Sequence, residues 1–96
     1  MAAYSLSTKA AADLDGIYEY TIVTFGLEQA RVYLSGLHEH LEILAEHPMQ
    51  GRSAGELAAA LRRSEYQSHV VFYMPKDHGV RIIRVLHKSM DIKRHL

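Results

Sequence analysis

The sequence of 96 residues contains no cysteine, only two prolines and no long apolar run. Without cysteine, a disulfide framework, a thiol nucleophile and a cysteine-based metal site are all excluded. No segment approaches the roughly 18–20 consecutive apolar residues that a membrane-spanning helix needs. The first residues also lack the basic and apolar segments of a secretory signal peptide, so we expect a cytoplasmic protein without a membrane partner.

An excess of charge of one sign is missing as well, because 11 Lys and Arg residues balance 11 Asp and Glu residues. The distribution is uneven, however. Residues 1–50 contain two basic and seven acidic side chains, whereas residues 51–96 contain nine basic and four acidic ones. The length predicts a single domain, residues 1–96, with an acidic half followed by a basic half. The basic half is the expected docking surface for an acidic partner or for a target.

Apolar residues at steps of three and four predict two helices. The first begins at Ser7 or Thr8, whose hydroxyl groups suit the N-cap, and it ends at Gly26. The second helix follows at once and stops before Pro48, because the residue before a proline disfavours the helical conformation. The short connection at Gly26 predicts that the two helices form an antiparallel hairpin.

The remaining segments have the composition of strands. Residues 3–6 alternate in polarity and predict a short first strand. Residues 61–66, 68–74 and 80–87 predict three more, and the last of these is apolar on both faces, which is typical of a central strand. The predicted fold class is α+β with the order β-α-α-β-β-β, in which an antiparallel helical hairpin packs on a twisted antiparallel sheet.

None of the seven histidines has the spacing of an HExxH metal site, and we expect neither a metal nor a cofactor. His87 differs from the others because it ends the best-defined strand. An imidazole in that place suits acid–base chemistry near neutral pH, or a structural hydrogen bond to the backbone. The guanidinium groups of Arg62, Arg63, Arg81 and Arg84 would suit a phosphate or a carboxylate if they shared one face; the alternative is a solvated sheet edge with scattered ion pairs.

Five segments, in this order, form a pattern that extends over nearly the whole chain. They are residues 6–21 (Leu-Ser, then Ala, Asp-Leu, Ile and a Tyr-rich turn), 25–34, 47–52, 68–73 and 83–91. Each motif is short, but together and at this spacing they resemble the ParE toxins of the RelE/ParE superfamily.

The resemblance implies the toxin of a type II toxin–antitoxin pair, folded as a helical hairpin on an antiparallel sheet. ParE toxins are described as inhibitors of DNA gyrase that stabilise cleaved DNA. A ParD-like antitoxin neutralises such a toxin, and its own N-terminal domain dimerises and binds operator DNA. The implied complex is a hetero-oligomer with two toxins on an antitoxin dimer, which reaches operator DNA only through the antitoxin.

The RelE branch of the superfamily offers a second interpretation, a ribosome-dependent mRNA endonuclease. The resemblance would then make His87 the acid or base and would place Arg84, with Arg62 or Arg63, on the phosphate. Valines occupy positions 70–71, where those enzymes tend to carry Arg, so the catalytic set is incomplete. A gyrase inhibitor without chemistry of its own is therefore the favoured interpretation, and a third is an inactive toxin kept as an antitoxin-binding partner.

Two binding surfaces follow as expectations. An apolar segment of the antitoxin is expected on the open side of the helical hairpin, and an acidic segment on the arginines of the strands. The expected antitoxin-binding residues are Leu14, Ile17, Tyr18, Leu34, Leu37, Arg62, Arg63, Arg81 and Arg84. For the apolar members of this set, the alternative is a place in the core of the chain itself. The expected target-binding residues are His87, Lys88, Met90, Lys93 and Arg94.

Overall fold

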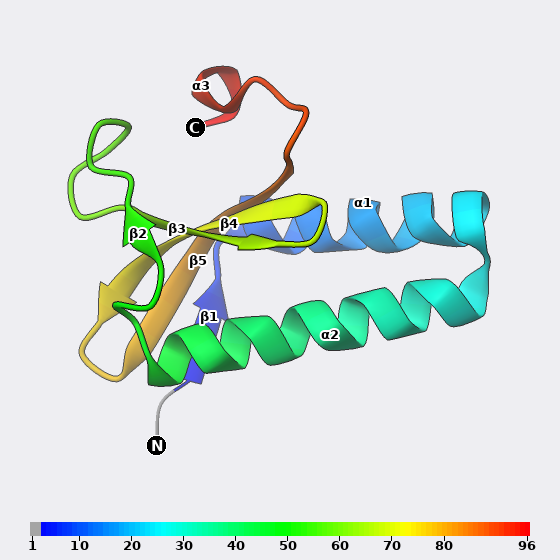
Figure 1. Cartoon of the computed structure of the whole chain (residues 1–96), viewed down its shortest axis with the longest axis horizontal. Helices are drawn as coiled ribbons and strands as arrows, with labels where there is room; N and C mark the ends of the chain where they lie inside the picture. Colours follow the sequence, from blue (N-terminus) through cyan, green and yellow to red (C-terminus); the bar gives the residue numbers. More distant parts are fainter. Residues whose placement is uncertain (1–2) are drawn as a thin grey trace.

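The computed structural model describes residues 3–96, in which two long helices lie beside one five-stranded sheet (Figure 1). Helices α1 (Thr8–Phe25) and α2 (Leu27–Glu46) are joined by Gly26 alone. The Oγ of Ser7 accepts a hydrogen bond from the backbone N–H of Ala10 at 2.9 Å and so caps α1. Gly26 has a φ of 95°, which L side chains rarely adopt, and it reverses the chain within one residue. The predicted cap, the glycine connection and the antiparallel hairpin are confirmed.

The sheet confirms the α+β fold class and corrects one detail of it. Its strands are β1 (Ala3–Leu6), β2 (Arg52–Ser53), β3 (Arg62–Tyr66), β4 (His69–Lys76) and β5 (Gly79–His87), in the order β1-β5-β4-β3-β2. Strands β3, β4 and β5 form an antiparallel meander. Strand β1 pairs with β5 in parallel, so the sheet is mixed rather than wholly antiparallel. No tight turn joins β1 to β5, and nothing in the local sequence therefore imposes an antiparallel pairing on them.

Two short elements were not predicted. Strand β2 and helix α3 (Ile92–His95) lie outside the ranges predicted as helices and strands. A strand of two residues and a helix of four are too short for hydrophobic periodicity to mark.

The hairpin covers one face of the sheet, and the larger core lies between them. Leu37, Leu41 and Leu44 of α2 are fully buried there, against Tyr73 of β4 and Ile82 of β5. We refer to this side of the sheet as the helix-covered face.

A second, smaller core occupies the opposite face of the sheet. Phe72 and Leu86 are buried there, with Ala54 and Leu61 of the β2–β3 segment and the partly buried Ile92 of α3. We refer to this side as the tail-covered face, because the chain returns over it after β5 (Figure 1).

Tyr73 fastens the end of the hairpin to the sheet. Its hydroxyl accepts a hydrogen bond from the N–H of Gly51 at 3.0 Å and donates one to the carbonyl oxygen of Pro48 at 2.8 Å. A Cβ atom at position 51 would lie 2.6 Å from the carbonyl oxygen of Arg63, so only glycine fits this close approach. The exit of α2 is thereby held at the edge of the core.

The substitution Tyr73→Phe is expected to lower the free energy of unfolding by about 1–3 kcal/mol, because it leaves a buried N–H and a carbonyl group without their partner. The control is Tyr20→Phe, since the Tyr20 side chain is 66% exposed; its effect is expected to stay within about 0.5 kcal/mol. Urea denaturation of the two variants measures both values. Equal unfolding midpoints would contradict the role given to the Tyr73 hydroxyl.

Candidate partner-binding surfaces

The end of the hairpin that carries Gly26 extends beyond the sheet (Figure 1). Large apolar side chains of this end are exposed. Tyr20, Val23 and Phe25 of α1 are 66%, 86% and 65% exposed, and Leu27 and Val32 of α2 are 45% and 57% exposed. These five residues form what we call the apolar tip. Large apolar side chains left exposed at one end of a small protein are typical of an interaction site.

A groove lies between the apolar tip and the sheet. It has a volume of about 480 Å³ and is lined by Tyr20, Thr21, Phe25, Gln29, Tyr33, Gln67, Ser68, His69 and His87. A second hollow of about 500 Å³ adjoins it and shares Tyr20, His69 and His87. The shared side chains are aromatic rings, which suit an apolar or aromatic side chain of a partner. We call the first of these hollows the aromatic groove.

Two histidines and a tyrosine form one wall of the aromatic groove. The hydroxyl of Tyr33 lies 2.6 Å from Nδ1 of His69, and the rings of His69 and His87 meet edge to face with their centroids 5.3 Å apart. Burial lowers the pKa of His69 to about 4, and the charge of His87 acts in the same direction. Burial raises the pKa of Tyr33. Tyr33 is therefore the donor to a neutral His69, and this wall is uncharged at His69 near pH 7.

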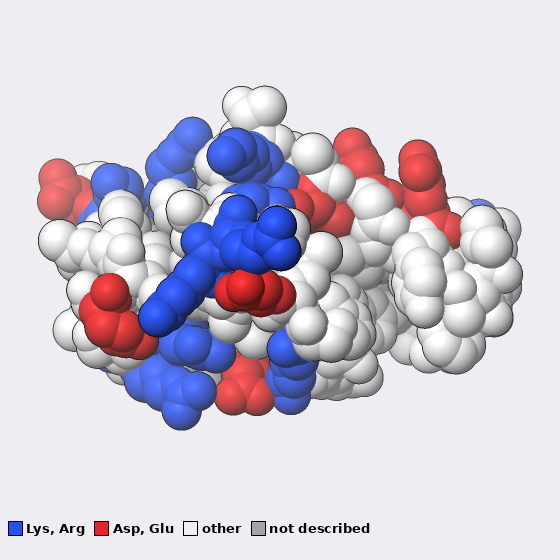
Figure 2. All heavy atoms as spheres, turned by 90° about the horizontal axis from the view of Figure 1, so that it is seen from above, with Lys and Arg blue, Asp and Glu red and all other residues white. Residues whose placement is uncertain are grey.

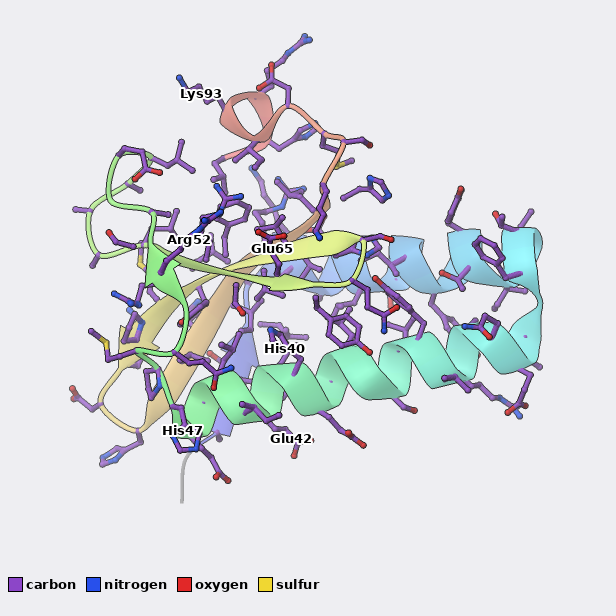
Figure 3. All side chains as sticks on the ribbon, in the orientation of Figure 1. His40, Glu42, His47, Arg52, Glu65 and Lys93 are labelled. Carbon is purple, nitrogen blue, oxygen red and sulfur yellow. The ribbon has the colours of Figure 1, made fainter. Side chains whose placement is uncertain are left out.

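Helix α2 carries a further polar contact to the sheet. Nε2 of His40 lies 2.9 Å from Oγ of Ser64, and Figure 3 shows His40 directed towards the sheet, whereas His47 lies at the helix exit. Burial lowers the pKa of His40. Within residues 3–96, no three His, Asp or Glu side chains come together in a way that would hold a metal ion. No helix in the same range is long and apolar enough to cross a membrane.

The apolar residues expected to bind the antitoxin lie mostly inside the chain's own core. Leu14 and Leu37 are 6% and 0% exposed, and they belong to the core between the hairpin and the sheet. Ile17 and Leu34 are partly buried against that core, and Tyr18 is also partly buried. Leu14 and Leu37 thus take the alternative role, because the stripe they belong to is the one that faces the sheet.

The residues of the apolar tip were missed by the sequence reasoning. A weak signal was present in the first helix, because Tyr20 and Val23, three residues apart, lie off the stripe that contains Leu14 and Ile17.

The arginines of the strands do not form a single patch. Arg62 pairs with Tyr73 on the helix-covered face and donates to the carbonyl oxygens of Met49 and Gly51. Arg63, its neighbour, points to the opposite face, where its guanidinium lies 5.3 Å from the ring centre of Phe72.

The two arginines of β5 also have partners inside the chain. Arg84 is bound by Asp13 at 2.8 Å, with both side chains less than 15% exposed. Arg81 reaches Oγ of Ser5 at 3.3 Å. Arg62 and Arg84 are therefore bound by groups of the chain itself. Arg63 and Arg81 have fewer such bonds, and they are the arginines of this set that remain for an acidic partner.

The residues of the ribonuclease interpretation are not brought together either. His87 pairs with His69 in the register of β4 and β5 and lines the aromatic groove on the side of the helices. Arg63 and Arg84 both pair with Phe72, on the tail-covered face. The imidazole and these two guanidinium groups therefore belong to opposite faces of the sheet. Arg62 shares the face of His87, but it lies at the other end of β3 from Tyr66, the residue that pairs with His69.

The expected target-binding residues lie in one stretch from the end of β5 to α3, in which every residue but Ile92 is exposed. His87, Lys88, Met90, Lys93 and Arg94 are all exposed. Lys88 forms an ion pair with Glu65 at 3.0 Å, and Arg52 approaches the same carboxylate at 3.6 Å.

Viewed onto the side that carries α3, basic side chains gather over the sheet and the tail, and acidic ones lie along the hairpin and between the basic groups (Figure 2). Figure 3 shows Lys93 projecting away from the sheet. The zero net charge is thus the sum of a mainly acidic hairpin and a mainly basic surface over the sheet and the tail.

Comparison with known proteins gives one consistent result. Residues 4–92 match the model of a family described as ParE toxin of type II toxin-antitoxin system, parDE. The chain is 47% identical over 98 residues to Toxin ParE1 of Caulobacter vibrioides, covering 100% of this chain and 99% of that protein. It is 34% identical over 97 residues to Toxin ParE of Escherichia coli, covering 100% of this chain and 94% of that protein.

The fold has a counterpart among solved structures. A chain of the chromosomal ParDE toxin–antitoxin system from P. aeruginosa superposes with a TM-score of 0.75 at 25% identity, over 91% of this chain and 96% of that chain.

The stability of the protein is expected to fall as the pH drops from about 6.5 to about 4. In the unfolded chain His69 binds a proton near its ordinary pKa of 6.5, whereas the folded protein keeps this imidazole neutral down to about pH 4. Protons therefore favour the unfolded state between these two values. Urea midpoints at pH 7 and pH 5 measure the loss.

The variant His69→Gln is expected to reduce this difference between the two midpoints, because it removes the imidazole that titrates. The matched control is His78→Gln, in the exposed turn after β4, which is expected to keep the difference. If His69→Gln retained the full pH dependence, the titrating group would lie elsewhere.

Proposed function

Because the chain belongs to the ParE toxin family of type II toxin–antitoxin systems, we propose that it inhibits DNA gyrase and that its basic C-terminal stretch is the surface that does so. Gyrase as the target rests on the ParE resemblance, which implies inhibition with stabilisation of cleaved DNA. The surface rests on one observation, the continuous exposure of residues 87–94 apart from Ile92. Long cationic side chains in such a stretch suit an acidic protein surface or the phosphates of bound DNA.

We further propose that a ParD-like antitoxin neutralises the toxin by inserting apolar side chains of an amphipathic segment into the aromatic groove and over the apolar tip. The groove is already formed, uncharged at His69 and bordered by large exposed apolar residues, as helix-in-groove recognition requires. An acidic part of the same antitoxin would meet Arg63 and Arg81. The complex would hold two toxins on an antitoxin dimer and would reach operator DNA only through the antitoxin.

The location of the groove offers a reason why antitoxin binding would block the toxin. His87 lines the aromatic groove, and it also begins the target-binding stretch. Ser89 and Met90 line the adjoining hollow. An antitoxin segment that fills both hollows would therefore cover the first residues that gyrase is proposed to contact.

The gyrase proposal predicts that the purified toxin blocks DNA supercoiling and traps cleaved DNA. The double variant K93E/R94E is expected to raise the half-inhibitory concentration at least about tenfold, because it reverses the charge of the proposed contact surface. The control K9E/K76E makes the same change of net charge at exposed positions on α1 and β4 and is expected to act like the unmodified chain.

The absence of both inhibition and trapped cleavage complexes with the unmodified toxin would refute the gyrase proposal. Cleavage of mRNA in the ribosomal A site, lost in His87→Ala, would establish the endonuclease interpretation in its place.

The antitoxin proposal predicts that Tyr20→Ala combined with Phe25→Ala weakens antitoxin binding at least about tenfold, because buried aromatic anchors dominate interface affinity. The control is Ile43→Ala, an apolar residue of α2 that is 46% exposed and does not line the aromatic groove. Calorimetric titration with the antitoxin encoded by the neighbouring reading frame measures both affinities. An unchanged affinity of the double variant would place the antitoxin on another surface.

A further inference from the structure

One buried ion pair connects the first helix, the last strand and the C-terminal helix. Nε and Nη2 of Arg84 donate to the two carboxylate oxygens of Asp13, each at 2.8 Å. The third nitrogen, Nη1, donates to the carbonyl oxygen of His95 at 2.6 Å. The guanidinium group thus uses one edge for α1 and its remaining amino group for α3.

Asp13 also binds the backbone of β5. Its Oδ2 accepts the backbone N–H of Val85 at 2.9 Å. Strand β1 pairs with β5 only as far as Ile82, so the next part of that edge of β5 has no strand beside it. The carboxylate takes the place of a neighbouring strand there, and its bond to Val85 fixes where Arg84 is held.

The geometry is of the kind that makes a buried ion pair stable. The side chains of Arg84 and Asp13 are 14% and 13% exposed, so removing them from water is costly. The fork-to-fork arrangement and the additional backbone bonds offset that cost. Because both carboxylate oxygens are engaged, the guanidinium plane has a single orientation, and that orientation directs Nη1 at His95.

The C-terminal helix has little else to hold it. Helix α3 has four residues, far fewer than the roughly 12–15 at which isolated helices begin to form in water. Its apolar contact with the sheet is Ile92, which packs against the smaller core on the tail-covered face. The hydrogen bond from Arg84 to the carbonyl of His95 fastens the other end. Lys93 and Arg94 lie between these two attachments.

We propose that Asp13 and Arg84 are positioning residues of the toxin: the pair fixes α3 on the tail-covered face so that Lys93 and Arg94 are presented together to the target. This inference rests on the proposed role of the C-terminal stretch in target binding. Neither residue needs to touch the target, because Arg84 acts through the backbone of His95 and Asp13 acts through Arg84.

The test compares three variants. Asp13→Asn keeps the size of the side chain but removes the charge that orients Arg84. Arg84→Lys keeps the net charge but cannot bind a carboxylate and a carbonyl group in one fixed plane. Asp15→Asn is the matched control, because it removes the same charge from an exposed position two residues further along α1.

The first readout is limited digestion with trypsin, followed by mass spectrometry. Cleavage after Lys93 and Arg94 is expected to become about tenfold faster in Asp13→Asn and Arg84→Lys, because charge-assisted hydrogen bonds of this strength change a local equilibrium by about that factor. Cleavage after Arg31, Arg52 and Arg62 is expected to stay unchanged. A general loss of stability would instead accelerate cleavage at every site.

The second readout is inhibition of gyrase, with growth arrest on expression in cells as a measure that does not depend on the identity of the target. Both are expected to weaken about tenfold in the two variants and to stay unchanged in Asp15→Asn.

Unchanged cleavage at Lys93 and Arg94, or a released tail with full activity, would overturn the inference. A wild-type toxin that arrests growth without inhibiting gyrase would refute only the gyrase proposal, because the variants would still be compared by growth arrest. A wild-type chain without any toxic effect would overturn both.

Discussion

The helical hairpin is longer than the sheet that it covers, and the main surfaces of the molecule follow from this mismatch. Helix α2 runs along β3: Tyr33 contacts Tyr66 at one end of the strand, His40 contacts Ser64, and Arg62 at the other end donates to the carbonyl oxygen of Met49, just past the helix. The part of the hairpin around Gly26 therefore extends beyond the end of the sheet (Figure 1). The bulky buried side chains of the hairpin, Leu14, Leu37, Leu41 and Leu44, accordingly lie in the half that faces the sheet. In the other half the buried residues are the small Thr21 and Ala30, and large apolar side chains of this half are exposed. The apolar tip and the aromatic groove are the result.

The two faces of the sheet consequently have different chemistry. On the helix-covered face, His40 and His69 take hydroxyl partners, and the edge of this layer opens into a groove that is uncharged at His69. On the tail-covered face, a smaller core supports a short helix with cationic side chains. Asp13 and Arg84 join the two sides at the edge of β5, so the toxin's proposed contacts for an antitoxin and for a target depend on one connected framework. The net charge of the whole chain is zero, so it does not reveal this difference between the two faces.

The sequence was sufficient for elements with a clear period, namely the two helices, the three later strands and the glycine connection. It was insufficient where the outcome depends on contacts between distant residues. The parallel pairing of β1 with β5 is one example, and the ion pair of Asp13 with Arg84, 71 residues apart, is another. Periodicity identified the stripe of Leu14 and Leu37 as apolar, but it could not decide whether the sheet or a partner covers it. The C-terminal basic stretch was predicted as exposed because its composition alone disfavours burial.

In the proposed complex, the antitoxin fills the aromatic groove and from there covers the start of the target-binding stretch. The most direct measurement is amide hydrogen exchange of the toxin, alone and with its antitoxin, read by mass spectrometry. Slower exchange in the complex is expected for peptides that cover residues 20–33, 67–69 and 87–90. Protection limited to β3 and the first half of β5, with residues 20–33 exchanging as in the free toxin, would contradict this arrangement.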